Sequence, residues 1–340
     1  MTTITKERLM NNLGVVAIGR NEGERLIRCL ASLQKHLSEG VPIVYVDSGS
    51  TDGSVAAAEA RGVQVVTLDM SVPFTGARAR NAGFDHLMAQ FPQTQYVQFI
   101  DGDCEILPGW IEAGVSALEA TPELAIVFGR LRERSPEASP YNQLADLEWN
   151  VPVGEALACG GISLMRSQPL QSVGGFNPKM ICGEEPELCI RLRQQGWKLR
   201  RIEADMALHD IDMHRFGQWW KRSIRGGWAV GEGFDMYGNT AEQYMRKENF
   251  SGWLWGVGVP VVAIALAFFT KGLTLLLLAV YAPLMWKIYR YRLQRGDSVK
   301  ASAIYAFFCV VSKVPQAMGQ GQYWLNRLQN RTATLIEYKG

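Results

Sequence analysis

The chain has 340 residues, of which 47% are hydrophobic, 20% charged and 10% aromatic, and its formal net charge is +2. This composition excludes a disordered chain and a fibrous repeat, and six scattered cysteines without a C-x-x-C pair exclude a disulfide scaffold and a standard zinc knuckle. Residues 246–340 hold 12 of the 35 Lys and Arg but three of the 33 Asp and Glu. Because this basic segment is also the most apolar one, it indicates a membrane anchor and not a nucleic-acid-binding domain.

Short apolar runs alternate with helical patterns through the N-terminal half. Four runs are typical of buried strands: Leu13–Ile18, Ile43–Val46, Val63–Leu68 and Tyr96–Ile100. Helical periodicity is found at Arg25–Leu37, Ala56–Ala60, Ala77–Gln90 and Ile111–Glu119. This alternation predicts an α/β fold with a mostly parallel sheet, and such sheets bind ligands at the carboxyl ends of their strands.

Polar loops follow three of these strands. They are G-R-N-E at 19–22, D-S-G-S-T-D-G at 47–53 and D-G-D at 101–103. The sequence contains no G-x-G-x-x-G and no G-x-x-x-x-G-K-[ST] loop, so the usual dinucleotide and P-loop signatures are missing. An acidic edge of this kind indicates a divalent cation that bridges carboxylates to a phosphorylated ligand.

Five motifs, in this order, resemble those of family 2 glycosyltransferases of GT-A fold. They are N-E at 21–22, V-D-S-G-S-T-D-G-S at 46–54, G-A-R-A-R-N-A-G at 76–83, F-I-D-G-D at 99–103 and C-G-E-E-P-E-L at 182–188. A further stretch, Q-W-W-K-R at 218–222, resembles the interfacial helix of membrane-bound members. The resemblance covers about residues 13–225 and implies a Rossmann-like GT-A domain, a nucleoside-diphosphate sugar donor (UDP or GDP) and a Mn²⁺ or Mg²⁺ cofactor.

The resemblance also assigns residues to the donor and the metal. Donor-binding roles fall on Asn21, Glu22, Asp47, Asp52, Arg80 and Asp101. Asp52 and Glu22 are equally suited to starting a helix, and Arg80 to a solvated helix face. Asp101 and Asp103 face the same way if the segment is extended, and then repel each other without a cation. By resemblance Asp103 binds the metal, Asp101 binds the ribose or the metal, and His209 is a further ligand, with His214 as the alternative.

Glu184 and Glu185 stand immediately before Pro186, a residue suited to the first turn of a helix. The family usually has Glu-Asp here, and its second acid is the general base. The resemblance therefore assigns the base to Glu185, while the Glu-Glu pair of this chain leaves Glu184 as the alternative. The structural alternative is that both acids only stabilise the start of the helix, where carboxylates complement the helix dipole.

Two apolar segments on either side of Lys271 dominate the C-terminal part. Residues 249–270 and 272–286 carry no charge, and basic residues flank the pair at both ends. A spanning helix needs about 20 apolar residues and positive flanks stay inside, so we expect a helical hairpin at about 252–270 and 272–288. A pair of core helices in a soluble domain is the alternative. A third run at 301–312 is too short to span and predicts an interfacial or re-entrant helix at about 301–326.

We therefore expect residues 1–245 to form a cytoplasmic glycosyltransferase domain with an interfacial helix near 214–230. Residues 246–340 are expected to anchor it in the cytoplasmic (inner) membrane. The expected reaction is inverting sugar transfer to a membrane-associated, lipid-linked saccharide in polysaccharide or glycan assembly, with no nucleic-acid partner. Acceptor or interface roles fall on Gln218, Trp219, Trp220 and Arg222. The alternatives are a polyprenyl-phosphate sugar transferase and a sugar nucleotidyltransferase, although residues 19–23 lack the Gly-rich loop of the latter class.

Overall fold

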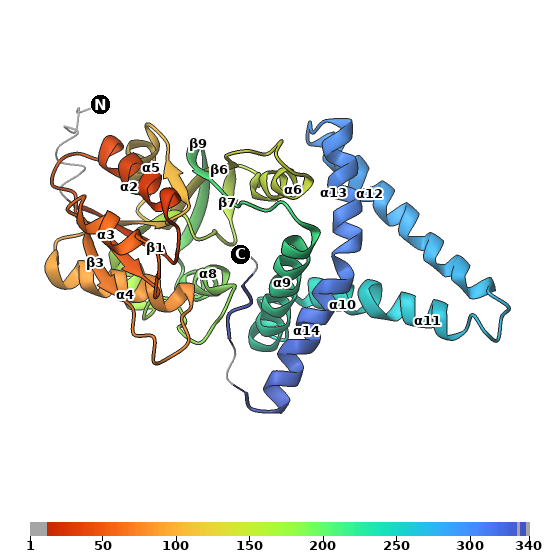
Figure 1. Ribbon diagram of the computed structural model, residues 1–340. Coiled ribbons are helices and arrows are strands. Elements are labelled where there is room, and N and C mark those ends of the chain that lie inside the picture. The colour runs from red at the N-terminus through yellow and green to blue at the C-terminus, as the bar shows by residue number, and fades with distance from the viewer. Residues whose placement is uncertain (1–11, 332–333, 338–340) are drawn as a thin grey trace. The chain divides into compact units, whose positions relative to one another are not determined.

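The structure is a computed structural model that describes residues 12–331 and 334–337 (Figure 1). The described residues form two compact units. Unit 1 contains those up to Arg134 and Trp149–Ile211, and unit 2 contains Ser135–Glu148 and those from Asp212 onward. The segment 135–148 therefore belongs to the second unit, although strands of the first unit precede and follow it in the sequence.

Unit 1 is built on a mixed sheet to which the described residues contribute nine strands, in the order β3-β2-β1-β4-β8-β6-β9-β5 with β7 beside β9. Its parallel part consists of β1 (Leu13–Gly19), β2 (Ile43–Asp47), β3 (Gln64–Thr67) and β4 (Tyr96–Asp101). The remaining strands are β5 (Cys104–Ile106), β6 (Leu124–Glu133), β7 (Gly154–Ala156), β8 (Ser163–Arg166) and β9 (Lys198–His209). Of their pairings, β6–β9 is parallel, and β4–β8, β6–β8, β5–β9 and β7–β9 are antiparallel.

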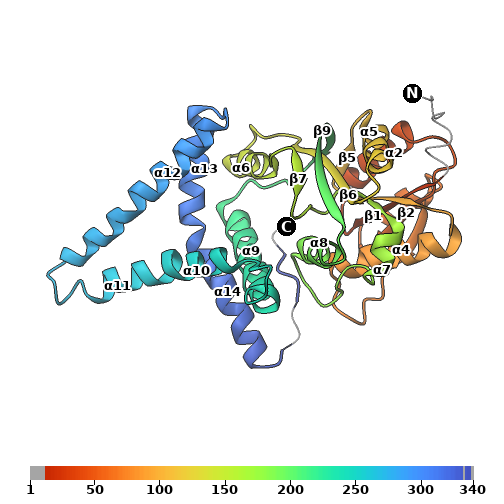
Figure 2. The same ribbon diagram turned by 180° about the vertical axis from the view of Figure 1, so that it is seen from behind.

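Helices cover this sheet on both sides, which explains why its central strands are almost continuously apolar. α2 (Glu24–His36) and α5 (Trp110–Ala120) lie along one side, and α4 (Gly76–Gln90) and α8 (Glu184–Gln194) along the other (Figures 1 and 2). The shorter helices are α3 (Ser54–Glu59) and α7 (Ser167–Ser172). The predicted α/β fold class is confirmed, and the strands and helices predicted in the first 120 residues begin and end within two residues of the observed ones.

Unit 2 is helical in the described residues. α6 (Pro140–Trp149) contributes all but its last residue to this unit, α9 (Phe216–Tyr237) lies alongside α14 (Lys313–Leu328), and α13 (Val299–Val311) precedes α14. A helical hairpin follows α9 in the sequence. Its first arm consists of α10 (Arg246–Trp253), a π-helical turn η1 (Leu254–Gly258) and α11 (Val259–Ala265). Its second arm consists of the 3₁₀ segment η2 (Leu273–Val280) and α12 (Tyr281–Gln294), as Figure 1 shows.

Among the described residues, two helical stretches are long and apolar enough to cross a membrane by length and composition alone: Leu273–Gln294 and Val299–Leu328. The second agrees within two residues at each end with the helix expected at about 301–326, but it is long enough to span, whereas the apolar run at 301–312 was judged too short. Pro315 lies in the first turn of α14, where a missing N–H is tolerated, so the helical path continues beyond it. The first predicted segment, 252–270, divides into parts of α10, η1 and α11, and helix α11 ends at Ala265.

Candidate functional site

The loops after β1 and β2 meet at one edge of the sheet, because these strands are parallel neighbours. Asn21 connects the two loops. Its N–H donates to Ser50 Oγ at 2.9 Å, and its side-chain oxygen accepts from the Thr51 N–H at 2.7 Å. Asn21 has a left-handed φ of 54°, a conformation that Asn adopts more readily than most residues.

Asp47, at the end of β2, holds the loop that follows it. Its Oδ2 accepts from the N–H groups of Gly49 at 3.0 Å and Ser50 at 2.9 Å. Its Oδ1 accepts from the Tyr45 hydroxyl at 3.1 Å, and burial together with the Asp47 carboxylate raises the pKa of Tyr45. The carboxylate therefore has a loop-building role here, and its predicted contact with the nucleotide stays a prediction.

Asp52 and Glu22 also have local partners. Asp52 Oδ1 accepts from the Ser54 N–H at 2.9 Å, at the start of α3. Glu22 pairs with Arg25 at 2.9 Å, at the start of α2. These contacts agree with the structural alternative for both residues and leave their predicted donor contacts as predictions.

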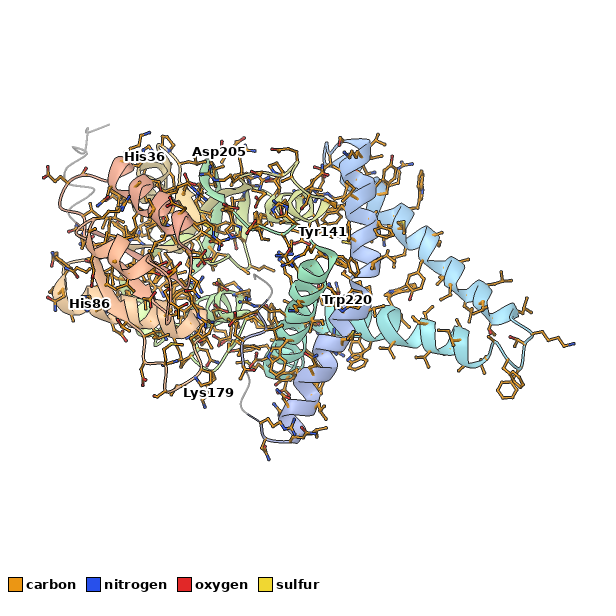
Figure 3. The ribbon with its side chains drawn as sticks, in the orientation of Figure 1. His36, His86, Tyr141, Lys179, Asp205 and Trp220 are labelled. Carbon is orange, nitrogen blue, oxygen red and sulfur yellow. The ribbon has the colours of Figure 1, made fainter. Side chains whose placement is uncertain are left out.

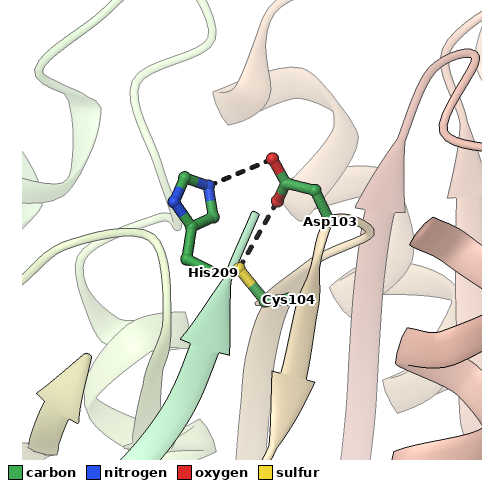
Figure 4. A group of neighbouring side chains, drawn as sticks. All are labelled: Asp103, Cys104 and His209. Atoms are coloured by element: carbon green, nitrogen blue, oxygen red, sulfur yellow. Dashed lines mark hydrogen bonds and ion pairs between the residues drawn. The ribbon is translucent and has the colours of Figure 1, made fainter. Parts of the chain in front are cut away.

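A group of three side chains lies where β5 begins and β9 ends (Figure 4). Cys104 stands directly opposite His209 in the antiparallel β5–β9 register, and Asp103 precedes Cys104. His209 Nε2 lies 3.0 Å from Asp103 Oδ2, and Cys104 Sγ lies 3.4 Å from Asp103 Oδ1. One potential ligand atom from each side chain falls within 4.8 Å of the other two, and all three residues are buried.

The geometry of this group fits a divalent cation. The 3.0 Å between His209 Nε2 and Asp103 Oδ2 is a hydrogen-bond distance, and it is also close to the separation of about 3.0 Å between adjacent ligand atoms around an octahedral ion. Carboxylate oxygen and imidazole nitrogen are both ligands of Mn²⁺, whereas a thiol suits softer ions. The Trp149 ring contacts the His209 imidazole, with centroids 4.6 Å apart at 74°, and so restricts the orientation of the imidazole.

The other histidines lie outside this group. His214 belongs to unit 2 and pairs with Asp212 at 3.0 Å. His36 and His86 lie on helices α2 and α4, and His86 contacts Gln64 (Figure 3). The structure therefore places His209 beside Asp103 within unit 1, and the metal-ligand role of either histidine stays a prediction.

Asp101 and Asp103 receive different partners, because the segment between them turns and is not extended. The Gly102 N–H donates to the carbonyl of Ile18, a residue of β1, at 2.7 Å. The Asp103 carbonyl instead accepts at 3.0 Å from the N–H of Asp210, the residue that follows β9. Asp101 Oδ1 instead accepts from Arg80 at 2.8 Å. The extended geometry that we expected from the sequence is wrong for this segment.

Arg80 lies at the centre of a second charged group, which we call the Arg80 cluster: Arg80, Asp101, Glu184 and Glu185. The guanidinium lies 2.8 Å from Asp101 Oδ1, 2.9 Å from Glu184 Oε1 and 3.1 Å from Glu185 Oε1. Its side chain is 5% exposed, so the alternative of a solvated helix face is wrong. Residues of three motifs far apart in the sequence are thus brought together.

Glu184 and Glu185 open α8 directly after Gly183, whose left-handed φ of 81° turns the chain into the helix. Burial and then the neighbouring Glu184 carboxylate raise the pKa of Glu185 to about 7, although Arg80 opposes this shift. A general base is most effective when its pKa lies near the working pH. Glu185 is therefore suited chemically to accept a proton near neutral pH.

Two glycines line the Arg80 cluster: Gly76, the first residue of the motif at 76–83, and Gly161, which no predicted motif includes. A Cβ on Gly161, in the loop before β8, would lie 3.0 Å from Asp101 Oδ2 and 3.1 Å from Glu185 Oε1, and would overlap Arg80. A Cβ on Gly76 would overlap Glu184 and Arg80. The Gly160-Gly161 pair was the available signal, since glycine permits a close approach of the backbone.

The predicted interface residues lie at the start of α9 in unit 2. The side-chain oxygen of Gln218 accepts from the N–H groups of His214 and Arg215, both at 2.9 Å, and so caps this helix. Trp220 is half-buried beside the exposed ring of Phe216 (Figure 3). Of the predicted set, Trp220 keeps an apolar surface that a membrane or an acceptor can contact.

Trp219 and Arg222 make contacts inside unit 2. Trp219 is buried against the rings of Tyr141 and Phe308. Arg222 donates to Glu148 Oε2 at 2.8 Å. Their predicted interface roles stay predictions, and their observed contacts hold α6 against α9 and α13.

Comparison with known proteins shows what this α/β unit is similar to. Residues 15–168 match the model of glycosyl transferase family 2. The Pre-mycofactocin glycosyltransferase of Mycobacterium tuberculosis is 27% identical over 212 residues, which cover 58% of this chain and 42% of that protein. Glycosyltransferase AglE of Haloferax volcanii is 23% identical over 217 residues, which cover 61% of this chain and 69% of AglE. Residues 15–168 of the α/β unit are therefore similar to glycosyltransferase family 2.

Solved structures show the same GT-A fold. The mannosyltransferase PcManGT of Pyrobaculum calidifontis, in complex with GDP-Man and Mn²⁺, aligns with a TM-score of 0.61 at 16% identity and covers 90% of this chain and 87% of its own. GalNAc-T7 with UDP, GalNAc and Mn²⁺ aligns with a TM-score of 0.51 at 14% identity, covering 72% of this chain and 50% of that one. The chain spans less than half of the length of the mycobacterial relative.

Proposed function

We propose that this chain transfers a sugar from a nucleoside-diphosphate sugar to a hydroxyl of a membrane-associated, lipid-linked saccharide, with inversion at the anomeric carbon. The observation that carries the proposal is the pair of groups on either side of Gly102: Asp103 with His209, and Asp101 within the Arg80 cluster. The first suits a metal that binds the donor diphosphate, and the second contains a carboxylate suited to activating an acceptor.

On the donor side, Asp103 and His209 would hold Mn²⁺ or Mg²⁺ through carboxylate oxygen and imidazole nitrogen. When bound, the ion would supply Lewis-acid stabilisation of the leaving nucleoside diphosphate. The proteins of similar fold that bind GDP-Man or UDP with Mn²⁺ support this donor class. Asn21 and the Asp47 loop, which lie at the same sheet edge, are proposed to line the nucleotide site.

On the acceptor side, Glu185 is the proposed general base. A sugar hydroxyl is a weak nucleophile at neutral pH, so its attack needs a carboxylate that removes its proton. The side chain of Glu185 is 14% exposed, against 5% for Glu184, and can be reached more easily. Removal of the proton by Glu185 during direct displacement of the diphosphate would invert the anomeric centre.

The helical hairpin of unit 2 is proposed to anchor the enzyme on the cytoplasmic side of the membrane. The support is its composition, together with the basic residues at both of its ends. α14 packs along α9, and α9 carries Arg222, Arg225, Glu232 and Asp235. A helix covered by such a charged neighbour fits an interfacial position better than one across hydrocarbon.

A donor screen tests the function as a whole. Membrane-purified protein would be offered UDP and GDP sugars with lipid extract as acceptor, and release of UDP or GDP would be measured. We expect release with one donor class that depends on the extract and on Mn²⁺ or Mg²⁺. Release that is unchanged without any acceptor lipid would contradict the proposed acceptor class, and absence of release with every donor would contradict the proposed donor class.

A further inference from the structure

The contacts of Arg80 differ from those expected of a phosphate-binding arginine. Its two terminal nitrogens are engaged by Asp101 at 2.8 Å and by Glu184 at 2.9 Å, with Glu185 at 3.1 Å from the latter nitrogen. Its side chain is 5% exposed. A guanidinium so enclosed by carboxylates has little surface left with which to bind a diphosphate.

The helix that carries Arg80 is itself held firmly. Its neighbour Asn81 donates from Nδ2 to the Phe176 carbonyl at 2.7 Å and accepts at Oδ1 from the Phe176 N–H at 2.9 Å. The Arg80 guanidinium also lies over the Phe176 ring, 5.7 Å from its centroid. About one turn after Arg80 on α4, Gly83 lies close to Val16 and Val46 of the sheet. Arg80 is thus presented from a rigid element.

We propose that Arg80 is a positioning residue, whose guanidinium, anchored by Glu184, holds the Glu185 carboxylate in the place from which it accepts the proton of the acceptor. This inference rests on the proposed function, because it assumes that Glu185 is the base. It assigns Glu184 to the anchoring of Arg80, which is a different task from that of its neighbour.

The chemistry of the cluster requires an arginine. A planar guanidinium directs several N–H groups in fixed directions and can contact three carboxylates at once, whereas an ammonium group is a point charge. Removing the one cation would leave three buried or half-buried carboxylates without compensation, and their repulsion would move them apart. Glu185, the proposed general base, would then lose its defined position.

A double-mutant cycle tests the proposal. The variants Arg80→Gln, Glu185→Gln and the double variant are purified, and kcat, donor KM and thermal unfolding are measured for each. We expect Arg80→Gln to lower kcat by about 10²-fold, within the range typical for loss of a general base, without a change in donor KM. Because Arg80 acts through Glu185, adding Arg80→Gln to Glu185→Gln should lower kcat no further.

Two further variants serve as a partial rescue and as a control. Arg80→Lys should recover part of kcat, since it restores the charge but not the geometry. Arg132→Gln, which removes an exposed arginine paired with Asp205 at 2.9 Å, should leave kcat at the wild-type value. If Arg80→Gln does not fold, Arg80→Lys replaces it in the same cycle.

The outcomes separate this inference from the proposed function. A raised donor KM in Arg80→Gln, or effects of Arg80→Gln and Glu185→Gln that multiply in the double variant, would overturn the positioning role and leave the proposed function intact. Wild-type turnover by Glu185→Gln would refute the proposed base, and with it the inference.

Discussion

At the scale of single residues, Glu184 and Glu185 show how neighbouring identical side chains acquire different properties. Glu184 lies deeper and pairs with Arg80 at 2.9 Å, whereas Glu185 is more exposed and has its pKa raised to about 7. The structure thus gives a physical basis for preferring Glu185, which the sequence alone placed only by resemblance.

The pH dependence of the reaction follows from this shift. A base must be deprotonated to act, so kcat/KM should rise as the pH increases through about 7, the pKa of Glu185. Glu185→Gln should lower the rate by about 10²–10⁴ and abolish this rise, while donor binding is retained. Initial rates from pH 5 to 9 would measure both effects.

The matched variant is Glu184→Gln. We expect it to affect the reaction indirectly, through Arg80, and to keep the rise in rate near neutral pH. Loss of that rise in Glu184→Gln alone would reverse the assignment. If both variants turn over normally, an anionic acceptor that needs no base, such as a polyprenyl phosphate, becomes the better explanation.

The metal site gives a second prediction at this scale. Asp103→Asn removes the carboxylate that is proposed to bind the metal together with His209, 3.0 Å away. It should weaken Mn²⁺ binding and abolish metal-dependent donor turnover without unfolding the chain. Calorimetric Mn²⁺ titration measures binding independently of activity. Asp205→Asn, at an exposed ion pair, serves as the control, and undiminished activity of the wild type in EDTA would argue against a metal requirement.

At the scale of elements, the loop from β7 to β8 is an unforeseen part of the site. It carries Gly161 against Asp101 and Glu185, whereas a Cβ on the adjacent Gly160 would have no atom within 4 Å. Neither glycine has a positive φ, so the two positions differ in their surroundings and not in backbone strain.

This difference predicts opposite results for neighbouring substitutions. Gly161→Ala should displace the Arg80 cluster and lower kcat at least tenfold, on the order of 1.4 kcal/mol in activation free energy. Gly160→Ala should leave kcat unchanged. Both variants would be compared by kinetics and thermal unfolding, and equal activities would show that the cluster tolerates displacement.

At the scale of the whole molecule, the helical hairpin of unit 2 has an apolar surface. The hairpin exposes large apolar side chains such as Phe268, Phe269 and Leu276. Such a surface is unusual for a soluble protein and agrees with contact to lipid.

Membrane topology can be tested by cysteine labelling in inverted and right-side-out vesicles. Five of the six native cysteines are buried and Cys309 is half-buried, so the wild-type chain gives the background. We expect Lys271→Cys to react from outside, and Lys247→Cys and Gln294→Cys from the cytoplasmic side. Labelling of positions 247 and 294 from opposite sides would rule out a hairpin.

The secondary structure of the α/β unit and the chemical groups of its loops could be predicted from the amino-acid sequence. Periodicity located the strands and helices of the first 120 residues, and the polar loops after β1, β2 and β4 marked the sheet edge, because parallel neighbours end on the same side. These features depend on residues close together in the chain, which local propensity and patterning control.

Tertiary structure decided which groups act together. The Arg80–Glu184 contact joins residues 104 positions apart, and the Asp103–His209 contact joins residues 106 positions apart. The β5–β9 register, which sets Cys104 opposite His209, brings His209 beside Asp103, and the turn at Gly102 gives Asp101 and Asp103 different partners. The placement of α6 in unit 2 likewise depends on packing with α9 and α13. Such pairings follow from the packing of whole elements, for which a single sequence carries no local signal.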